Sequence, residues 1–400
     1  MRFVAHLDAD CYYVSADRVR YPDLIGKPVG VVGNQGACVI AKSYELKAQG
    51  VKTGEPVWDV LKKCPETIFV KRDFRWYEVL SRRMLAMVRE RSEAAEFYSI
   101  DEFFFSTDAD KQIARGIQND ILNNIGLPVT IGVARSRTLA KLFSDTAKPL
   151  GIRVVTDPDE EREHLAKLPV GEVSGIGHRR AAKLLLHGIR TCLDYANAER
   201  RLIRGLLTKT GEDLWWELRG QPVTPIRPDR PTHKFLSRGG SIGGASADPN
   251  VIRAWLVRNS ERLVEELEHY DLKAGTLSLS LSDQYGGGDS INAPLPGHTN
   301  RYGPIIAALL RSFERCWQPG TVITHMHLVA GDLKRPGFVQ RTLFDPPDDE
   351  TEPLAVVKRD VNERHGRFAV RGGTTLFIPE MYRDRSHGYE ICDVRGKFCF

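Results

Sequence analysis

The sequence predicts a multidomain α/β protein with α+β character, on three observations. Its 400 residues exceed the usual domain length of about 100–150 residues more than twofold. Residues 1–165 alternate strand-like and helix-like patterns, whereas residues 166–231 show helical patterns alone. Residues 232–330 then follow the order β-α-β-β-α-β, which is the ferredoxin-like succession.

Within residues 1–165, two apolar runs at 2–7 and 97–105 predict strands. The clearest helix is 74–91, where Tyr77, Leu80, Met84 and Val88 recur on one face. The other expected elements are strands at 29–33 and 129–134 and helices at 11–20, 42–49, 113–121 and 137–148.

The helical region contains Gly175-Ile176-Gly177 followed by Gly188-Ile189, a spacing that fits a helix-hairpin-helix. The proline-rich residues 222–231 predict a linker. Beyond it, residues 276–282 alternate strictly between polar and apolar side chains, as in a half-buried strand. The remaining expected elements of this unit are strands at 234–242 and 321–330, a short strand near 290–293 after the glycine turn 286–288, and helices at 250–270 and 303–317. Residues 345–400 show no strong periodicity.

Composition excludes several classes of protein. No apolar run approaches the roughly 20 residues of a membrane span, and we expect no signal peptide and no membrane partner. The seven cysteines are scattered without a C-x-x-C pair, which argues against a disulfide framework or a zinc site and favours the cytoplasm. A net charge of +5 is too small to indicate nucleic-acid binding by itself.

Two acidic clusters carry the chemistry: one contains Asp8, the other Asp101 and Glu102. Carboxylates in apolar strands are costly to bury unless compensated, and divalent cations are the usual compensation. Each residue alone is more simply a surface carboxylate, but two clusters in one domain suit a two-metal phosphoryl-transfer site. Because adjacent strand residues point to opposite faces, either the backbone is irregular at 101–102 or the longer Glu102 reaches around.

These clusters belong to motifs that resemble the Y-family translesion DNA polymerases over residues 1 to about 345. The motifs are His-Leu-Asp-Ala-Asp-Cys-Tyr-Tyr (6–13), Gly-Val-Lys-Thr-Gly (50–54), Ser-Ile-Asp-Glu (99–102), Val-Thr-Ile-Gly-Val-Ala (129–134), Leu-Ala-Lys-Leu (139–142), Ala-Lys-Pro-Leu-Gly (147–151) and Gly-Ile-Gly (175–177). The bacterial polymerase V catalytic-subunit branch is the most similar, while Tyr44 resembles the polymerase IV branch.

The resemblance implies a right-hand polymerase. Its parts would be a palm (1–10 and 75–165), small fingers (11–74), a helical thumb (166–231), a ferredoxin-like little finger (232–343) and a clamp-binding peptide with a C-terminal tail (344–400). Asp8, Asp101 and Glu102 would be catalytic and would hold two Mg²⁺ ions, or Mn²⁺ as a substitute, with the Ala9 carbonyl. We expect a structural role for Asp10.

Nucleotide-binding residues follow from the same resemblance. Tyr13 would be a steric gate that excludes a 2′-OH, while Tyr12 is either a second nucleotide contact or a core aromatic. The triphosphate would be held by Tyr44, Lys47 and Lys148. The alternative is that these three are solvated helix residues without a role in binding. The family often has Arg where this chain has Lys47, and Lys lacks the bidentate fork, so the grip would be looser there.

DNA and partner contacts are also implied. Backbone N–H groups at Gly175 and Gly177 would hold a DNA phosphate. In the little finger, the proposed phosphate contacts are Lys234, Arg238 and Arg253. The alternative is that these are ordinary solvated surface residues. The residues that resemble a sliding-clamp peptide are Gln340, Leu343 and Phe344. The alternative is that this segment is a polar turn. Residues 363–374 are a candidate partner surface, with a disordered tail as the equal alternative.

The resulting hypothesis is a template-directed translesion DNA polymerase that uses primer-template DNA and dNTPs. Its other expected partners are the bacterial sliding clamp, accessory subunits and a recombinase filament, with nucleoid association when active. A non-catalytic scaffold that binds DNA and clamp is disfavoured because all three carboxylates are present. A nucleotide cyclase is disfavoured because it needs neither the helix-hairpin-helix nor the second α/β unit.

Overall fold

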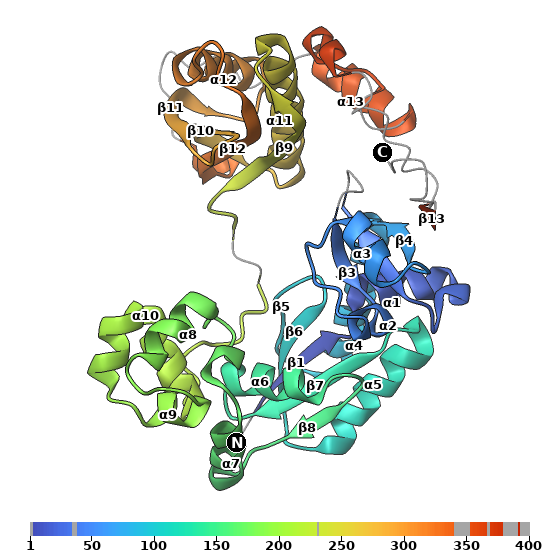
Figure 1. The fold of residues 1–400 in the computed structure, drawn as a ribbon, viewed down its shortest axis with the longest axis vertical. Coiled ribbons are helices and arrows are strands. Elements are labelled where there is room, and N and C mark those ends of the chain that lie inside the picture. The colour runs from blue at the N-terminus through green and yellow to red at the C-terminus, as the bar shows by residue number, and fades with distance from the viewer. Residues whose placement is uncertain are drawn as a thin grey trace. The chain divides into compact units, whose positions relative to one another are not determined.

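A computed structural model describes residues 3–33, 38–229, 232–339, 353–365, 369–378 and 391–392. The chain forms two compact units, Met1–Arg230 with Glu390–Cys399, and Pro231–Tyr389 with Phe400 (Figure 1). In the described ranges, every helix is too short or too polar to cross a bilayer.

A five-stranded sheet lies at the centre of the first unit, in the order β5-β6-β1-β7-β8. Strand β1 (Phe3–Ala9) is antiparallel to both of its neighbours, β6 (Glu102–Thr107) and β7 (Val129–Ala134). The edges are β5 (Ala95–Phe97) and β8 (Ile152–Val154), and β8 was not expected from the sequence. The first acidic cluster therefore lies on the central strand of the sheet.

The prediction of one strand over 97–105 is wrong. Strands β5 and β6 form an antiparallel hairpin, and residues 98–101 make the turn between them. The backbone N–H groups of Tyr98 and Ser99 both donate to the carbonyl of Glu102, at 3.1 and 3.0 Å. The run contains no Gly, Pro or Asn, and the apolar residues on either side concealed the turn signal of Ser99 and Asp101.

Helices cover both faces of this sheet. Side chains at alternate positions of β1 point to opposite faces, so Ala5 and Leu7 pack with α4 (Phe74–Arg91) and α5 (Lys111–Ile125). Val4 instead packs with residues of α6 (Arg137–Ala147) such as Leu139 and Phe143. The even-numbered residues of β1, Asp8 included, therefore share the face that α6 covers.

Gly132 allows α6 to lie against the sheet. A Cβ atom at this position of β7 would lie 2.2 Å from the Ala140 carbonyl oxygen and 2.5 Å from the Ser144 nitrogen. We expect Gly132→Ala to lower the free energy of unfolding by about 1–3 kcal/mol, because backbone must move to admit the methyl group. Chemical denaturation measures this. Gly205→Ala in α10 is the matched control, since its Cβ would meet open space, and equal losses would contradict the argument.

A smaller sheet follows β1, in the order β13-β4-β2-β3. Its strands are β2 (Val29–Val32), β3 (Val39–Lys42), β4 (Ile68–Lys71) and the two-residue β13 (Ile391–Cys392). The helices of this region are α1 (Tyr12–Arg20), η1 (Pro22–Leu24), α2 (Tyr44–Ala48) and α3 (Val57–Lys63). Helix α1 begins three residues after β1 ends, so its first turn lies beside the acidic end of the sheet.

The rest of the first unit is helical. Its elements are α7 (Pro158–Lys167), η2 (Val170–Glu172), α8 (His178–Leu185), α9 (Cys192–Asn197) and α10 (Arg200–Leu218). The Ser136 hydroxyl, at the start of α6, donates to the Glu217 carbonyl oxygen at 2.6 Å. The Glu217 carboxylate accepts from the backbone of Thr138 and Thr224, at 3.1 and 2.9 Å. These bonds fix the end of α10 to the start of α6.

The second unit is a four-stranded antiparallel sheet in the order β11-β10-β12-β9. Its elements are β9 (Leu236–Ser246), α11 (Pro249–His269), β10 (Lys273–Asp283), β11 (Gly288–Thr299), α12 (Tyr302–Cys316), β12 (Ile323–Lys334) and the short η3 (Pro336–Phe338). Strand β12 separates β9 from β10, and β10 separates β11 from β12. Both β-α-β units are therefore split, as the ferredoxin-like succession implies.

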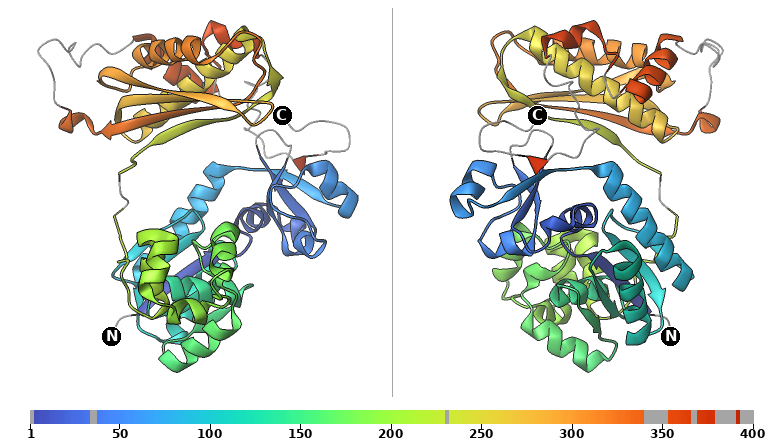
Figure 2. Two further views of the ribbon diagram at one scale, coloured as in Figure 1. Left: turned by 60° about the vertical axis from the view of Figure 1, so that its left-hand side comes forward. Right: turned by 90° about the vertical axis from the view of Figure 1, so that its right-hand side faces the viewer.

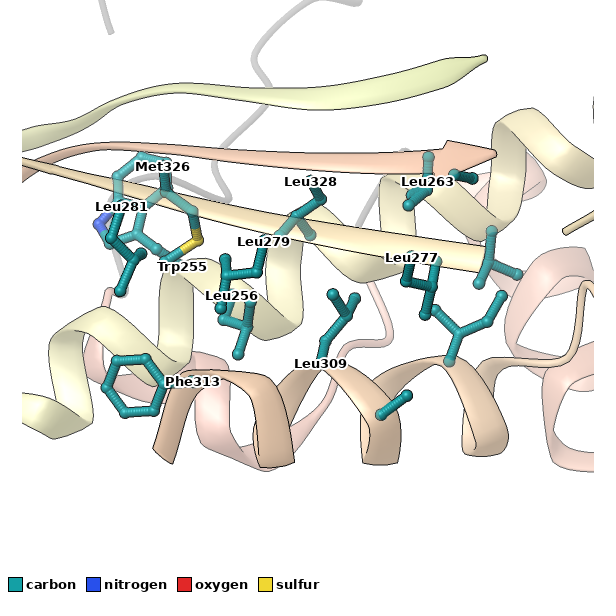
Figure 3. Packing of buried hydrophobic residues seen from close by; sticks show 14 of the residues in the cluster. Trp255, Leu256, Leu263, Leu277, Leu279, Leu281, Leu309, Phe313, Met326 and Leu328 are labelled. Carbon is teal, nitrogen blue, oxygen red and sulfur yellow. The ribbon is translucent and has the colours of Figure 1, made fainter. Parts of the chain in front are cut away.

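Both helices of this unit lie on one face of its sheet (Figure 2). Leu277, Leu279 and Leu281 of β10 point toward side chains of α11 and α12 such as Leu256 and Phe313 (Figure 3). The residues between them, Ser278 and Ser280 among others, face the opposite side and stay partly exposed. The alternation read at 276–282 is thus a half-buried strand.

Residues after the second sheet also pack on α11. Helix α13 (Pro353–His365) places the Lys358 Nζ 2.6 Å from Oε1 of the buried Glu261, and the Gly372 N–H donates to the same oxygen at 3.1 Å. The 3₁₀ helix η4 (Gly373–Phe377) precedes Ile378, which joins the core. Part of the candidate partner surface at 363–374 is therefore held by its own domain, although residues 366–368 lie outside the described ranges.

Candidate active site

The backbones of three acidic residues adjoin where β1 and β6 meet. The strand register pairs Asp8 with Glu102 directly, and the N–H of Ala9 donates to the carbonyl of Asp101 at 3.0 Å. Asp101 lies in the turn before β6, whereas Glu102 is the first residue of the strand. Of the two explanations left open for adjacent carboxylates, the irregular backbone is the one observed.

Helix α6 and the residue that follows it supply cationic partners for two of these carboxylates. Lys141 Nζ lies 2.8 Å from Glu102 Oε1, and Lys148 Nζ lies 2.7 Å from Asp8 Oδ2. Asp145 lies 3.7 and 3.5 Å from the two ammonium groups. Lys141 and Asp145 were missed by the sequence reasoning. Their spacing with Lys148, at i, i+4 and i+7 on one helix face, is the signal that could have found them.

Burial and ion pairing act differently on the two paired carboxylates. Asp8 is only 4% exposed, and its burial raises its pKa to about 7 despite the attraction of Lys148. Burial also opposes ionisation of Glu102, but the hydrogen-bonding groups of His6 and Lys141 outweigh it and lower its pKa to about 2. Burial thus favours the neutral form of Asp8, whereas the partners of Glu102 favour its charged form.

The lysines occupy carboxylate oxygens that a metal ion would need. Among the residues that the structure describes, no three His, Cys, Asp or Glu side chains are gathered into a ready metal site. The donor chemistry nevertheless fits a hard divalent cation, because the donors are all carboxylates and the buried Asp8 lacks full charge compensation. An ion that binds Glu102 Oε1 or Asp8 Oδ2 would displace Lys141 or Lys148 from that oxygen.

Asp10 does not share this arrangement. Its carboxylate accepts hydrogen bonds from Thr130 Oγ1 at 3.0 and 3.1 Å and from the Leu150 N–H at 2.7 Å. These bonds join the end of β1 to β7 and to the loop after α6. Asp10 therefore holds the backbone around the acidic cluster.

The two tyrosines that open α1 have different surroundings. Tyr12 is 4% exposed and donates its hydroxyl to the Tyr77 carbonyl, so it is a core aromatic. The half-buried Tyr13 ring is stacked on Tyr77 with centroids 4.6 Å apart, and Phe74 meets it edge-on at 5.6 Å. Burial and the neighbouring Asp101 charge raise the pKa of Tyr13. A ring held this way lies beside the carboxylates.

The three residues expected at a triphosphate come from two elements. The Tyr44 hydroxyl lies 3.4 Å from Asp10 Oδ1, and the exposed Lys47 places its Nζ 5.9 Å from the Tyr44 ring centroid. Lys148 follows the last residue of α6 and contacts Asp8. The structure therefore brings all three to the acidic edge of the sheet.

The turn that contains Gly175 and Gly177 differs in one respect from the predicted helix-hairpin-helix. It follows the single 3₁₀ turn η2 rather than an α-helix. Gly175 has φ +95°, which side chains of L-residues rarely adopt, and Gly177 caps the N-terminus of α8. Ile176 between them is buried in the helical core, so both exposed glycines present backbone outward.

The basic residues chosen in the second unit are placed unequally. Lys234 is exposed just before β9. Arg238 shares the helix-covered face of β9 with Leu236 and forms an ion pair with Glu266 of α11. Arg253 lies over the Phe313 ring, 5.4 Å from its centroid. Two of the three thus make contacts on the helical side of their own domain. Gln340, Leu343 and Phe344 lie outside the described residues.

Comparisons with known proteins identify the family of this chain. Residues 7–145 match the impB/mucB/samB family, and residues 233–343 match the C-terminal domain of that family. A DNA polymerase IV of Bacillus velezensis is 30% identical over 393 residues, covering 94% of this chain and 93% of the relative. Protein UmuC of Salmonella typhimurium is 28% identical and covers 90% of each chain. A solved Y-family DNA polymerase chimera superimposes with a TM-score of 0.72 at 22% identity, covering 84% of this chain and 100% of the other.

Proposed function

Since this chain belongs to the impB/mucB/samB family of Y-family DNA polymerases, we propose that Asp8, Asp101 and Glu102 are its catalytic carboxylates. The protein is a template-directed DNA polymerase of the translesion type, which adds dNTPs to a primer 3′-OH. The observation that supports the residue assignment is the direct pairing of Asp8 with Glu102, with Asp101 in the adjoining turn.

Y-family polymerases generally use divalent metal ions, and Mg²⁺ is our proposal for this chain, with Mn²⁺ as its substitute. Asp8, Asp101, Glu102 and the carbonyl of Ala9 would hold two ions. When bound, such ions acidify the attacking hydroxyl and neutralise charge on the leaving group. The preference for Mg²⁺ rests on the all-oxygen donor set.

Residues around the carboxylates would bind the nucleotide. We assign the triphosphate to Tyr44, Lys47 and Lys148, because Tyr44 and Lys148 contact the carboxylates of β1 and Lys47 lies beside Tyr44, and because a cation on Asp8 Oδ2 would displace the Lys148 ammonium group. A phosphate oxygen is the natural next partner for that ammonium group. We assign the sugar to Tyr13, whose ring Tyr77 and Phe74 fix in place.

Primer-template binding would use phosphate contacts in both units. The exposed backbone at Gly175 and Gly177 suits a phosphate. Lys234 is the freest of the little-finger candidates, while Arg238 and Arg253 would have to leave Glu266 and Phe313 to take part.

Primer extension tests the function. We expect the protein to extend a primer on a template with Mg²⁺ and dNTPs, and to bind that DNA with an affinity that falls steeply with salt. Binding without extension would favour the alternative, a non-catalytic scaffold of the same fold.

We also propose that Gln340, Leu343 and Phe344 insert into the groove of a bacterial sliding clamp. The support is the sequence pattern, in which two apolar anchors stand beside the acidic residues 345–352. The polymerase V-like features of the sequence lead us to propose accessory subunits, a recombinase filament and nucleoid association as well.

The clamp proposal has a direct test. Leu343→Ala with Phe344→Ala should abolish stimulation by the clamp and leave distributive synthesis intact, because neither residue is among those assigned to catalysis. Primer extension with and without clamp measures both quantities, and Phe338→Ala, an exposed aromatic just after β12, is the matched control. Unchanged stimulation in the double variant would refute the assignment.

A further inference from the structure

A buried histidine, His6, faces the acidic site from β1. It lies on β1 two residues before Asp8, on the face that α6 covers, and is 0% exposed. Its Nδ1 lies 2.7 Å from the Ser144 hydroxyl, and its ring centroid lies 4.6 Å from that of Phe104. Its Nε2 has no hydrogen-bond partner within 3.5 Å among the described residues. The facing acceptor is Glu102 Oε2, 3.6 Å away.

The surroundings decide which nitrogen carries the hydrogen. A ring with its hydrogen on Nδ1 alone would turn the bare Nε2 lone pair toward Glu102 Oε2, which would place two acceptors face to face in a buried space. With the hydrogen on Nε2, Ser144 donates to Nδ1 and Nε2–H points at Glu102 Oε2. The Ser144 hydroxyl has one hydrogen and two acceptors within reach, His6 Nδ1 at 2.7 Å and the Lys141 carbonyl oxygen at 2.8 Å, and in this arrangement it donates to Nδ1.

We propose that His6 is a positioning residue, which directs Oε2 of Glu102 through its Nε2–H and leaves Oε1 free for a cation. The proposal rests on the catalytic role assigned to Glu102. Lys141, the other partner of Glu102, holds Oε1 and must release it when a divalent ion binds. His6 contacts the opposite oxygen and is fixed in the core, so it can stay in place throughout.

A fixed partner matters because Glu102 is long and begins a strand. Its side chain has three rotatable bonds, and a metal-binding carboxylate must be held to within about 0.5 Å. The 3.6 Å separation is longer than a hydrogen bond. Contacts of this kind in a site without its substrate often shorten once the site is filled. Groups that orient metal-binding side chains typically contribute about 10–100-fold to metal affinity or activity.

The test compares two full-length variants. His6→Phe fills the ring volume and keeps the contact with Phe104 but has no N–H. His6→Gln has less ring packing but can place an amide N–H near the position of Nε2. A merely structural role favours Phe, whereas a donor to Glu102 favours Gln, so the order of the two variants separates the explanations.

Three measurements follow each variant. The first is the rate constant of single-nucleotide extension against the KM for dNTP. The second is Mn²⁺ binding, by the electron paramagnetic resonance signal of free Mn²⁺, with a chain-terminated primer-template and dNTP so that no chemistry occurs. The third is thermal unfolding. We expect His6→Phe to lower the rate constant and the Mn²⁺ affinity about 10–100-fold with an unchanged KM for dNTP, and His6→Gln to restore most of both.

Equal or better activity and Mn²⁺ binding in His6→Phe than in His6→Gln would overturn the proposal. If His6→Phe does not fold, Ser144→Ala serves instead, because it removes the hydroxyl that orients the imidazole; unchanged Mn²⁺ affinity in that variant overturns the proposal too. A wild-type protein that binds Mn²⁺ but never extends primers refutes the proposed function, while the order of Mn²⁺ affinities among the variants still decides the role of His6.

Discussion

Asp101→Ala is expected to reduce primer extension about a thousand-fold or more while primer-template binding is retained. A carboxylate that holds catalytic metal ions contributes several kcal/mol of transition-state stabilisation, and each 1.36 kcal/mol is a factor of ten in rate. The fold should survive. The contact that joins Asp101 to β1 is made by its backbone carbonyl with Ala9, and the side chain itself accepts a 2.8 Å bond from Ser99 Oγ.

Asp108→Asn is the matched control for this experiment. Asp108 is an exposed carboxylate just beyond the other end of β6, so its loss changes the net charge equally without touching the site. Single-turnover extension measures the effect, and the salt dependence of DNA binding shows whether the DNA surface is intact. Extension by Asp101→Ala at the rate of the control would remove Asp101 from the catalytic set.

Tyr13→Ala is expected to raise the efficiency of ribonucleotide incorporation, relative to deoxyribonucleotide, by about 10–100-fold. The ring is stacked on Tyr77 and met by Phe74, so it cannot turn away from a ligand without breaking two aromatic contacts. Forcing an extra atom against a fixed group costs about 1–3 kcal/mol, which corresponds to that range of discrimination.

Tyr13→Phe separates the ring from the hydroxyl. It keeps the stack on Tyr77 and should keep the sugar selectivity, because the exclusion is steric. Alanine suits position 13, which lies inside α1, so the larger change should not unfold the helix. The ratio of kcat/KM for paired ribonucleotides and deoxyribonucleotides decides the matter, and an unchanged ratio in Tyr13→Ala would show that another group excludes the 2′-OH.

The residues of α6 that lie against the sheet, together with Lys148 just after it, affect both the stability and the chemistry of this site. Lys141, Ser144, Asp145 and Lys148 recur at helical spacing and meet Glu102, His6 and Asp8. Gly132 permits that approach, since any side chain there would push α6 away from the sheet. A substitution of Gly132 is therefore expected to displace the partners of the carboxylates as well as to disturb the core.

Much of the fold could be predicted because periodicity is a local property. Helix α4 and strand β7 have the bounds that the sequence predicts, since apolar side chains recur along each without interruption. The hairpin at 95–107 could not be predicted, because an apolar run reads alike whether or not the chain reverses within it. The 3₁₀ turn η2 and the short strand β8 were also not predicted, because elements of only three residues are too short to show a periodicity.

The sequence by itself determined the chemistry available: two acidic clusters, a tyrosine beside the first, and a lysine after α6. It could not decide how Asp101 and Glu102 serve one site, because side chains that alternate along a regular strand would point apart. Only the tertiary structure placed Asp101 in a turn, paired Asp8 with Glu102, and set Lys141 and His6 on opposite oxygens of Glu102. Those relations depend on strand register and on the approach of α6 to β7, and both are fixed by contacts between residues far apart in the chain.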